Sequence, residues 1–142
     1  MSDVMQRNWT VIRDLLEHFE DETIAGFLSE IRQGHRYDST LTPEENQLAQ
    51  ADSERKADIV FGHLLLLMDS ELVKGIVSAQ PAAGSWSCVL RNPRHTMKGH
   101  DALDAIRSDT VWNAVKAKAK EAALPVTLEL ILAVLRKMSL LA

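Results

Sequence analysis

Apolar residues recur with helical spacing over three stretches, so the pattern predicts a mainly α-helical protein. The first stripe consists of Trp9, Ile12, Leu15, Leu16 and Phe19. A second follows the acidic residues 20–22 and runs from Ile24 to Ile31. Residues 53–71 give the strongest signal, because they are apolar nearly all round and therefore belong at the centre of the core. His63 interrupts that apolar stretch, and we expect it to be a hydrogen-bonded core residue rather than a ligand.

Between these helices the pattern predicts a loop, a short helix and a hairpin. Residues 33–42 lack periodicity and are typical of a surface loop. Thr42-Pro43-Glu44-Glu45 is a helix start, and we expect a short, half-exposed helix from there to Asp52. The polar turn Ser53–Lys56 then begins the central helix. Two β-rich runs, 72–79 and 86–91, flank a Pro/Gly turn at 80–84 and predict a β-hairpin.

The stretch from Arg94 to Val115 predicts two capped helices. Thr96 is the expected N-cap of the first, and Gly99 lets another backbone come close. Either Ser108 or Asp109 caps the second. Three further side chains of this stretch are expected in the core: Leu103, Ile106 and Trp112.

Leu124-Pro125 then breaks the chain, and a last helix is expected over 126–140. This helix is apolar around most of its circumference. It therefore either crosses the middle of the core or binds a partner, for example a second copy in a homodimer. Together the elements predict a mainly α fold with a small β-hairpin, a winged helix-turn-helix-like core plus C-terminal helices. The expected domain covers 1–123, including loop 33–42, and 124–142 form a C-terminal helix that packs on the core or on a partner.

Composition narrows the class of protein. A chain of 142 residues with 46% apolar and 25% charged residues is an ordinary single globular domain. The sequence has no membrane-spanning apolar run and no apolar segment of a secretory signal near its start. Cys88 is the single cysteine, so an internal disulfide is excluded. We therefore expect a cytoplasmic protein without a membrane partner.

The net charge of −4 is unevenly distributed. Residues 1–58 hold 13 acids and 6 Lys/Arg, whereas residues 59–142 hold 7 acids and 10 Lys/Arg. Arg91, Arg94 and Lys98 lie in a segment without acids between Cys88 and His100. Such asymmetry either marks a face for an anionic partner or reflects a solvated surface whose charge merely varies.

Catalytic chemistry finds little support. The chain has no phosphate-binding glycine motif and no G-x-S-x-G. Cys88 with His95 or His100 would be a thiol–imidazole pair, but a lone cysteine on a strand is typically a small apolar filler. A metal site from His95, His100, Asp101 and Asp104 is disfavoured, because on one helix Asp101 points away from His100 and Asp104. We expect no enzyme, no cofactor and no metal.

Three motifs carry a resemblance. They are R-N-W-x-x-I-R-x-L-L (Arg7–Leu16), H-L-L-L-L-x-D-S-E-L-V (His63–Val73) and H-T-M-K-G-H-D-A-L-D-A-I-R-S-D-T-V-W-N-A-V-K (His95–Lys116). The last is similar to the ending LTxxGHDFLDAIRxDTVWxxVK of a family of small phage and prophage proteins of unknown function. The resemblance implies a winged-helix fold and a phage context, with the cytoplasm of a bacterial host cell as the location, and not a reaction. The chain departs from that family at Ser70-Glu71, where the helix-ending turn often has Ala-Gly.

Two functional hypotheses follow. The first is a DNA-binding regulatory protein of a phage or prophage, whose helix from Ser53 enters the major groove of duplex DNA. Its DNA-contacting residues would be Arg55, Lys56, Lys74, Arg91, Arg94 and Lys98. Against it stand Glu54 and Asp58, which flank the supposed base-reading residues.

The second hypothesis is a non-enzymatic inhibitor of a host defence system, similar to an anti-CRISPR protein, that binds a basic host protein complex. Its acidic surface would consist of Glu17, Glu20, Asp21, Glu22, Glu44, Glu45, Asp52, Glu54 and Asp58. Trp86, just after the hairpin turn, would add an aromatic contact if it is exposed. Trp9 and Trp112 lie on helix stripes and are expected in the core.

Overall fold

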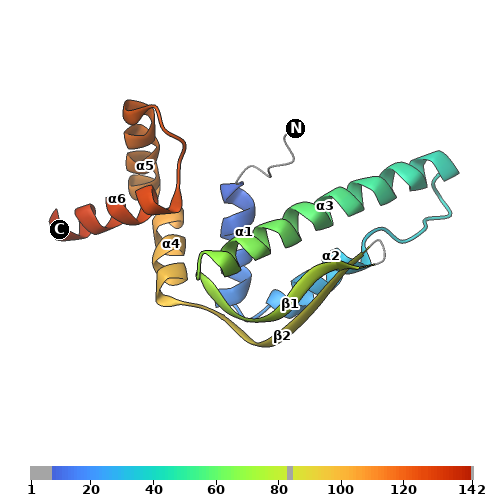
Figure 1. Ribbon diagram of the computed structural model, residues 1–142. Coiled ribbons are helices and arrows are strands. Elements are labelled where there is room, and N and C mark those ends of the chain that lie inside the picture. Colours follow the sequence, from blue (N-terminus) through green and yellow to red (C-terminus); the bar gives the residue numbers. More distant parts are fainter. Residues whose placement is uncertain (1–7, 83–84, 142) are drawn as a thin grey trace.

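The computed structural model describes residues 8–82 and 85–141. Their elements are α1 (Trp9–Glu20), α2 (Ile24–Gln33), α3 (Pro43–Asp69), β1 (Val73–Ala82), β2 (Ser85–His95), α4 (Met97–Arg107), α5 (Asp109–Ala122) and α6 (Leu128–Leu141). Figure 1 shows a mainly helical molecule with a two-stranded antiparallel hairpin, which confirms the coarse fold prediction. The finer winged-helix arrangement stays a prediction. The start of the first motif, at Arg7, lies outside the described residues.

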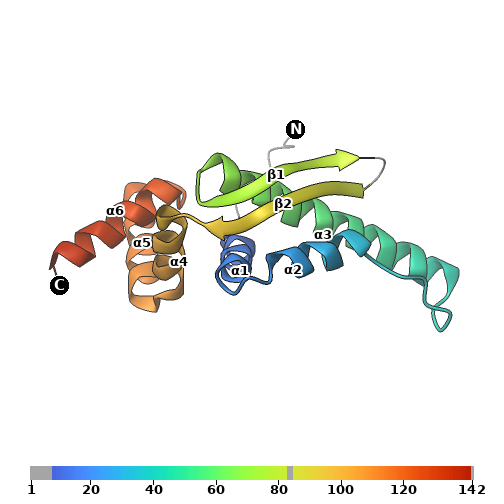
Figure 2. The same cartoon turned by 90° about the horizontal axis from the view of Figure 1, so that it is seen from below.

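The elements form two groups along the length of the molecule. The hairpin lies along α2 and α3, whereas α4, α5 and α6 gather at one end (Figures 1 and 2). The first half of α3 and the loop before it extend at the opposite end (Figure 1). That loop, residues 34–42, is mostly exposed, as predicted.

The start of α1 is fixed by two side chains. Asn8 is its N-cap and accepts hydrogen bonds from the backbone N–H groups of Thr10 and Val11. His63 of α3 is 1% exposed and accepts the Asn8 backbone N–H at Nε2 over 2.8 Å. Its Nδ1 lies 2.7 Å from the Ile59 carbonyl oxygen, to which it donates in this tautomer. The prediction that His63 is a hydrogen-bonded core residue is confirmed.

Helix α3 corrects the predicted pair of helices meeting at Ser53. It runs without a break over 27 residues from the capping box of Thr42 and Glu45. No Gly or Pro interrupts residues 44–61, and Gln50 donates to Glu54 across one turn at 3.2 Å. Arg55 likewise pairs with Asp52. Ser53 therefore lies inside a helix, where its backbone N–H is already used, and no recognition helix begins there.

The hairpin is longer than predicted, since β1 and β2 extend over 73–82 and 85–95. Part of its predicted turn, residues 83–84, lies outside the described residues. Two register irregularities flank Ile76, between Lys74 and Ser78. Gly75 has a φ of +94°, and a Cβ there would lie 2.5 Å from the Pro93 Cα. The irregularity therefore depends on glycine at this position.

The two ends of the hairpin meet at the start of α4, in a group of contacts that we call the hairpin base: Glu71, Leu72, Thr96 and Gly99. The Thr96 backbone N–H donates to the Leu72 carbonyl oxygen at 2.9 Å, and its hydroxyl donates to the Glu71 carbonyl oxygen at 2.7 Å. The same hydroxyl caps α4 by accepting the Gly99 N–H at 3.1 Å. The predicted roles of Thr96 and Gly99 are confirmed.

Two apolar clusters form the core. The larger comes from α1, α2, α3 and α4, together with Leu72, Val73 and Leu128, and the smaller consists of Ala105, Val111, Val115 and Ile131. Trp9 and Trp112 pack against both clusters and meet edge-to-face, with ring centroids 5.9 Å apart. Both rings are half-buried. The predicted core tryptophans therefore lie at the junction between the clusters.

Helix α6 packs on α4 and α5, where its buried Ile131 joins the smaller cluster, and its buried Leu128 joins the larger one. Ser108 caps α5 by accepting the Val111 N–H at 3.2 Å, which decides between the two predicted caps. Whether α6 also joins two copies stays a prediction. No described helix combines the length and the apolar character that a membrane span requires.

Gly99→Ala should destabilise the fold strongly. The added Cβ would lie 2.0 Å from the Leu72 carbonyl oxygen, a contact that only backbone movement can relieve. We expect a loss of more than about 2 kcal/mol in the free energy of unfolding, measured by urea denaturation. Gly26→Ala is the matched control, because nothing lies within 4 Å of its Cβ position inside α2. It should stabilise the protein by up to about 1 kcal/mol, and equal losses in both variants would contradict the assignment.

Candidate nucleic-acid interface

Four of the predicted DNA-contacting residues lie together in one open groove of about 840 Å³, which we call the basic groove. Lys74 comes from β1, Arg91 and Arg94 come from β2, and Lys98 comes from the first turn of α4. The hairpin base holds these elements together. Residues more than twenty positions apart in the sequence therefore contribute to one surface. The charge pattern alone left open whether these cations share a face.

Among the described residues, the four cations of this groove keep their charge. No carboxylate of the described residues forms a salt bridge with any of the four side chains. Between Glu71 and Asp101 the sequence contains no Asp or Glu. The Arg94 guanidinium donates to the Asn92 carbonyl oxygen at 2.9 Å, which orients it without cancelling its charge. The groove is therefore positively charged.

Apolar and acidic side chains complete its walls. Met97 and Val77 line the groove and are 85% and 55% exposed. Glu71 is the acid among the lining residues, and sequence analysis missed its role. It has a φ of +61°, a left-handed conformation that favours glycine. The sequence does contain a signal for this role, because Ser70-Glu71 stands where the similar family often has Ala-Gly. That difference places both backbone strain and a negative charge at the groove.

The other two predicted DNA-contacting residues, Arg55 and Lys56, do not line the groove. They lie in the interior of α3, and Arg55 is paired with Asp52. A recognition helix contacts bases through its N-terminal residues, and this position is not an N-terminus. The predicted six-residue set is therefore divided between two places.

The predicted acidic surface is also divided. Glu17, Glu20, Asp21 and Glu22 lie where α1 ends, whereas the remaining five acids lie along α3. Several are engaged within the molecule: Glu17 pairs with Arg13 at 2.7 Å and Glu20 with Arg107 at 2.6 Å. The Arg107 hydrogen bond lowers the pKa of Glu20, so this carboxylate stays ionised.

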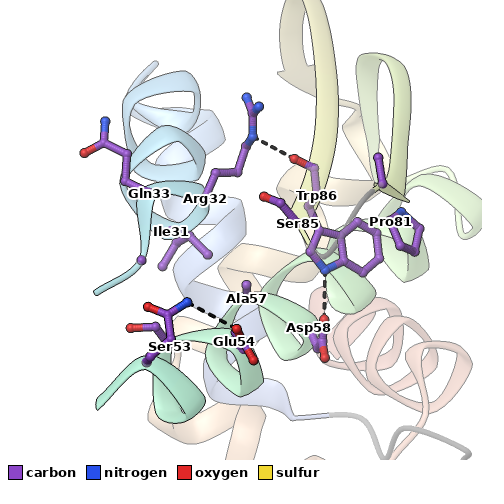
Figure 3. Close-up of a pocket in the computed structure, with 13 residues that line it drawn as sticks. Ile31, Arg32, Gln33, Ser53, Glu54, Ala57, Asp58, Pro81, Ser85 and Trp86 are labelled. Atoms are coloured by element: carbon purple, nitrogen blue, oxygen red, sulfur yellow. Dashed lines mark hydrogen bonds between the residues drawn. The ribbon is translucent and has the colours of Figure 1, made fainter. Parts of the chain in front are cut away.

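Trp86 lines a second pocket of about 450 Å³ between α2, α3 and the hairpin (Figure 3). Its ring stacks on Phe61 with centroids 5.1 Å apart, and its indole N–H donates to Asp58 at 2.9 Å. Arg32 of α2 donates to the Trp86 carbonyl oxygen at 2.8 Å. Trp86 is half-buried, so its main contacts fasten the hairpin to α2 and α3.

The residues considered for catalysis do not come together as one group. Cys88 is half-buried beside Leu28 and Leu90, and burial raises the pKa of its thiol. His95 and His100 instead lie next to Glu20, with ligand atoms of all three within 4.8 Å of one another. Asp101 is not part of this group. The sequence did not reveal the group because Glu20 comes from α1, far from both histidines along the chain.

Comparison with known proteins assigns the chain to a family. Residues 6–125 match the family described as Hypothetical protein (DUF2513). The chain belongs to this family. A protein of Haemophilus influenzae described as "Uncharacterized protein" is 32% identical to it over 127 residues, 89% of each chain. No solved structure matches the chain.

The DUF2513 match includes the hairpin base, the basic groove and the Glu20–His95–His100 group. Helix α6, which begins at Leu128, lies beyond the matched residues. The family description carries no activity.

Trp86→Ala should cost about 3 kcal/mol of unfolding free energy, since it removes a stacked ring that joins the hairpin to α3. Trp86→Phe keeps an aromatic ring over Phe61 and loses only the indole hydrogen bond to Asp58, so it should cost about 1 kcal/mol. Urea denaturation measures both losses. Wild-type stability in the alanine variant would show that this ring does not fasten the hairpin.

Proposed function

We propose that this protein binds duplex DNA through the basic groove. The observation that carries the proposal is the gathering of Lys74, Arg91, Arg94 and Lys98 on one surface whose lining holds a single acid, Glu71. Lys and Arg side chains arranged in this way neutralise phosphates and position a protein on a duplex. The net charge of −4 does not oppose this, because phosphates interact with the local surface within about a Debye length of 8–10 Å.

The proposed contact differs from the one expected of a recognition helix. It uses the base of the hairpin and the first turn of α4, whose cationic side chains would contact the DNA backbone. Met97 would add an apolar contact to a sugar or a base edge, because it is 85% exposed beside the cations. Phosphate contacts dominate such an interface, so we assign affinity to it and not base specificity.

A regulatory role in a phage or prophage is the finer part of the proposal, and it rests on the resemblance of the His95–Lys116 motif. If α6 joins two copies, two basic grooves would be related by a two-fold axis. Such a dimer would suit a palindromic site.

Replacing the four cations with glutamine should abolish this binding. Four phosphate contacts predict a slope of about −3.6 in log K against log salt and about a hundredfold loss of affinity between 50 and 200 mM salt. Fluorescence anisotropy with a labelled duplex measures both quantities. Arg55→Gln with Lys56→Gln is the control, since these side chains do not line the groove, and it should change affinity less than twofold.

Wild-type affinity in the four-residue variant would overturn the proposal, and so would a salt-independent affinity of the native protein. A loss in the control equal to that of the groove variant would move the interface to α3.

Glu71→Gln should act in the opposite direction and strengthen duplex binding several-fold. The change removes the negative charge among the lining residues, while its backbone carbonyl still accepts the Thr96 hydroxyl. The salt dependence should become slightly steeper, because one more phosphate can be approached. Affinity below that of the native protein would contradict DNA binding at this surface.

The alternative proposal, an inhibitor that binds a basic host protein complex, is supported by the projecting first half of α3. Glu44 and Glu45 are exposed in its first turn, and Glu54 is exposed at the pocket that Trp86 lines. A pull-down from host lysate, with and without nuclease, separates the two proposals. Protein partners that persist after nuclease and are lost on reversing these three charges favour the inhibitor; recovered DNA favours the groove.

A further inference from the structure

The end of α1 and the start of α4 hold three metal-ligating side chains in one place. Glu20 is the last residue of α1, His95 ends β2, and His100 lies in the first turn of α4. One ligand atom from each lies within 4.8 Å of the other two. The two imidazole rings are tilted by 40° with centroids 5.3 Å apart. A site with two imidazoles and one carboxylate binds divalent transition metals in preference to magnesium or calcium.

We propose that Glu20, His95 and His100 bind a zinc ion, with water completing the coordination. Ligand atoms of a tetrahedral zinc site lie about 3.4 Å apart, as bond lengths of about 2.0–2.1 Å require. The present ligand atoms lie within 4.8 Å of one another, so side-chain movement alone can close the group. His100 supplies this freedom, since half of its side chain is exposed.

The backbone around this group is already fixed. Thr96 bonds both the Leu72 carbonyl and the first turn of α4, so His95 and His100 extend from a rigid corner. Gly99 lies between them in the sequence, and its Cβ position is 3.2 Å from the Cβ of His95. Glu20 approaches this corner from another element, so a bound ion would join α1 to the β2–α4 corner.

Arg107 is the competitor for this site. Its guanidinium donates to Glu20 at 2.6 and 3.4 Å, so a cation must share or displace this partner. Asp104 lies 3.4 Å from the His100 Nε2 and supplies a neighbouring carboxylate that could orient the ring. Replacing either Glu20 or Arg107 breaks this ion pair. The zinc affinity should fall when Glu20 is replaced and rise when Arg107 is replaced.

The experiment is calorimetric titration of zinc chloride into the untagged full-length protein. We expect one ion per chain. Glu20→Gln and His100→Asn each remove a ligand and should weaken binding by more than about tenfold. Arg107→Gln breaks the Glu20–Arg107 pair but leaves the ligands, and it should tighten binding several-fold. Glu30→Gln on α2 is the control, because Glu30 is exposed and lies outside the group; it should bind like the native protein.

The native protein's failure to bind zinc would overturn the proposal, as would equal affinities in all four variants. Weakening in Arg107→Gln to the level of Glu20→Gln would also overturn it, because zinc affinity would then follow the ion pair and not the ligands. A melting temperature that rises with zinc in the native protein but not in Glu20→Gln is the independent readout.

Discussion

The contact between the Gly99 backbone and the Leu72 carbonyl oxygen determines where the rest of the molecule lies. No side chain fits between them, because a Cβ at Gly99 would stand 2.0 Å from that oxygen. Because the two backbones are so close, Thr96 after β2 donates hydrogen bonds to the Glu71 and Leu72 carbonyl oxygens before β1. The same residue also caps α4. One close backbone contact therefore sets the end of α3, both strands and the direction of α4. The C-terminal helices then follow, since α4 carries Ala105, which packs with Ile131 of α6.

Two surfaces of different chemistry extend from this corner. Arg94 and Lys98 line the basic groove, whereas His95 and His100, which alternate with them in the sequence, lie next to Glu20. The alternation is a consequence of the turn between β2 and α4, which sends neighbouring residues to different sides. An ion held by the histidines would therefore stiffen the segment that carries Lys98 without occupying the groove.

Local patterns predicted what depends on local physics. The caps at Thr42, Thr96 and Ser108 are side-chain hydrogen bonds within one turn, and the sequence contains all the groups involved. The boundary at Ser53 was wrong because a polar turn on an exposed helix looks the same as a helix start when no Gly or Pro separates them. Four of the six residues predicted to contact DNA line the groove, and all four lie in a run without acids that is visible in the sequence. Its acid, Glu71, and the ligand Glu20 depend on tertiary contacts that periodicity does not encode.

Glu71 shows how the fold and the proposed function compete at one residue. Its left-handed conformation would cost less with glycine, and its carboxylate reduces the positive charge of the groove beside Lys74. Neither effect serves stability or tight phosphate binding. A charge that weakens binding at a strained turn does, however, limit attraction to DNA of any sequence, since that attraction comes from phosphates alone. If the protein binds DNA as proposed, the acid at this strained turn keeps the phosphate contacts weaker than the four cations alone would make them.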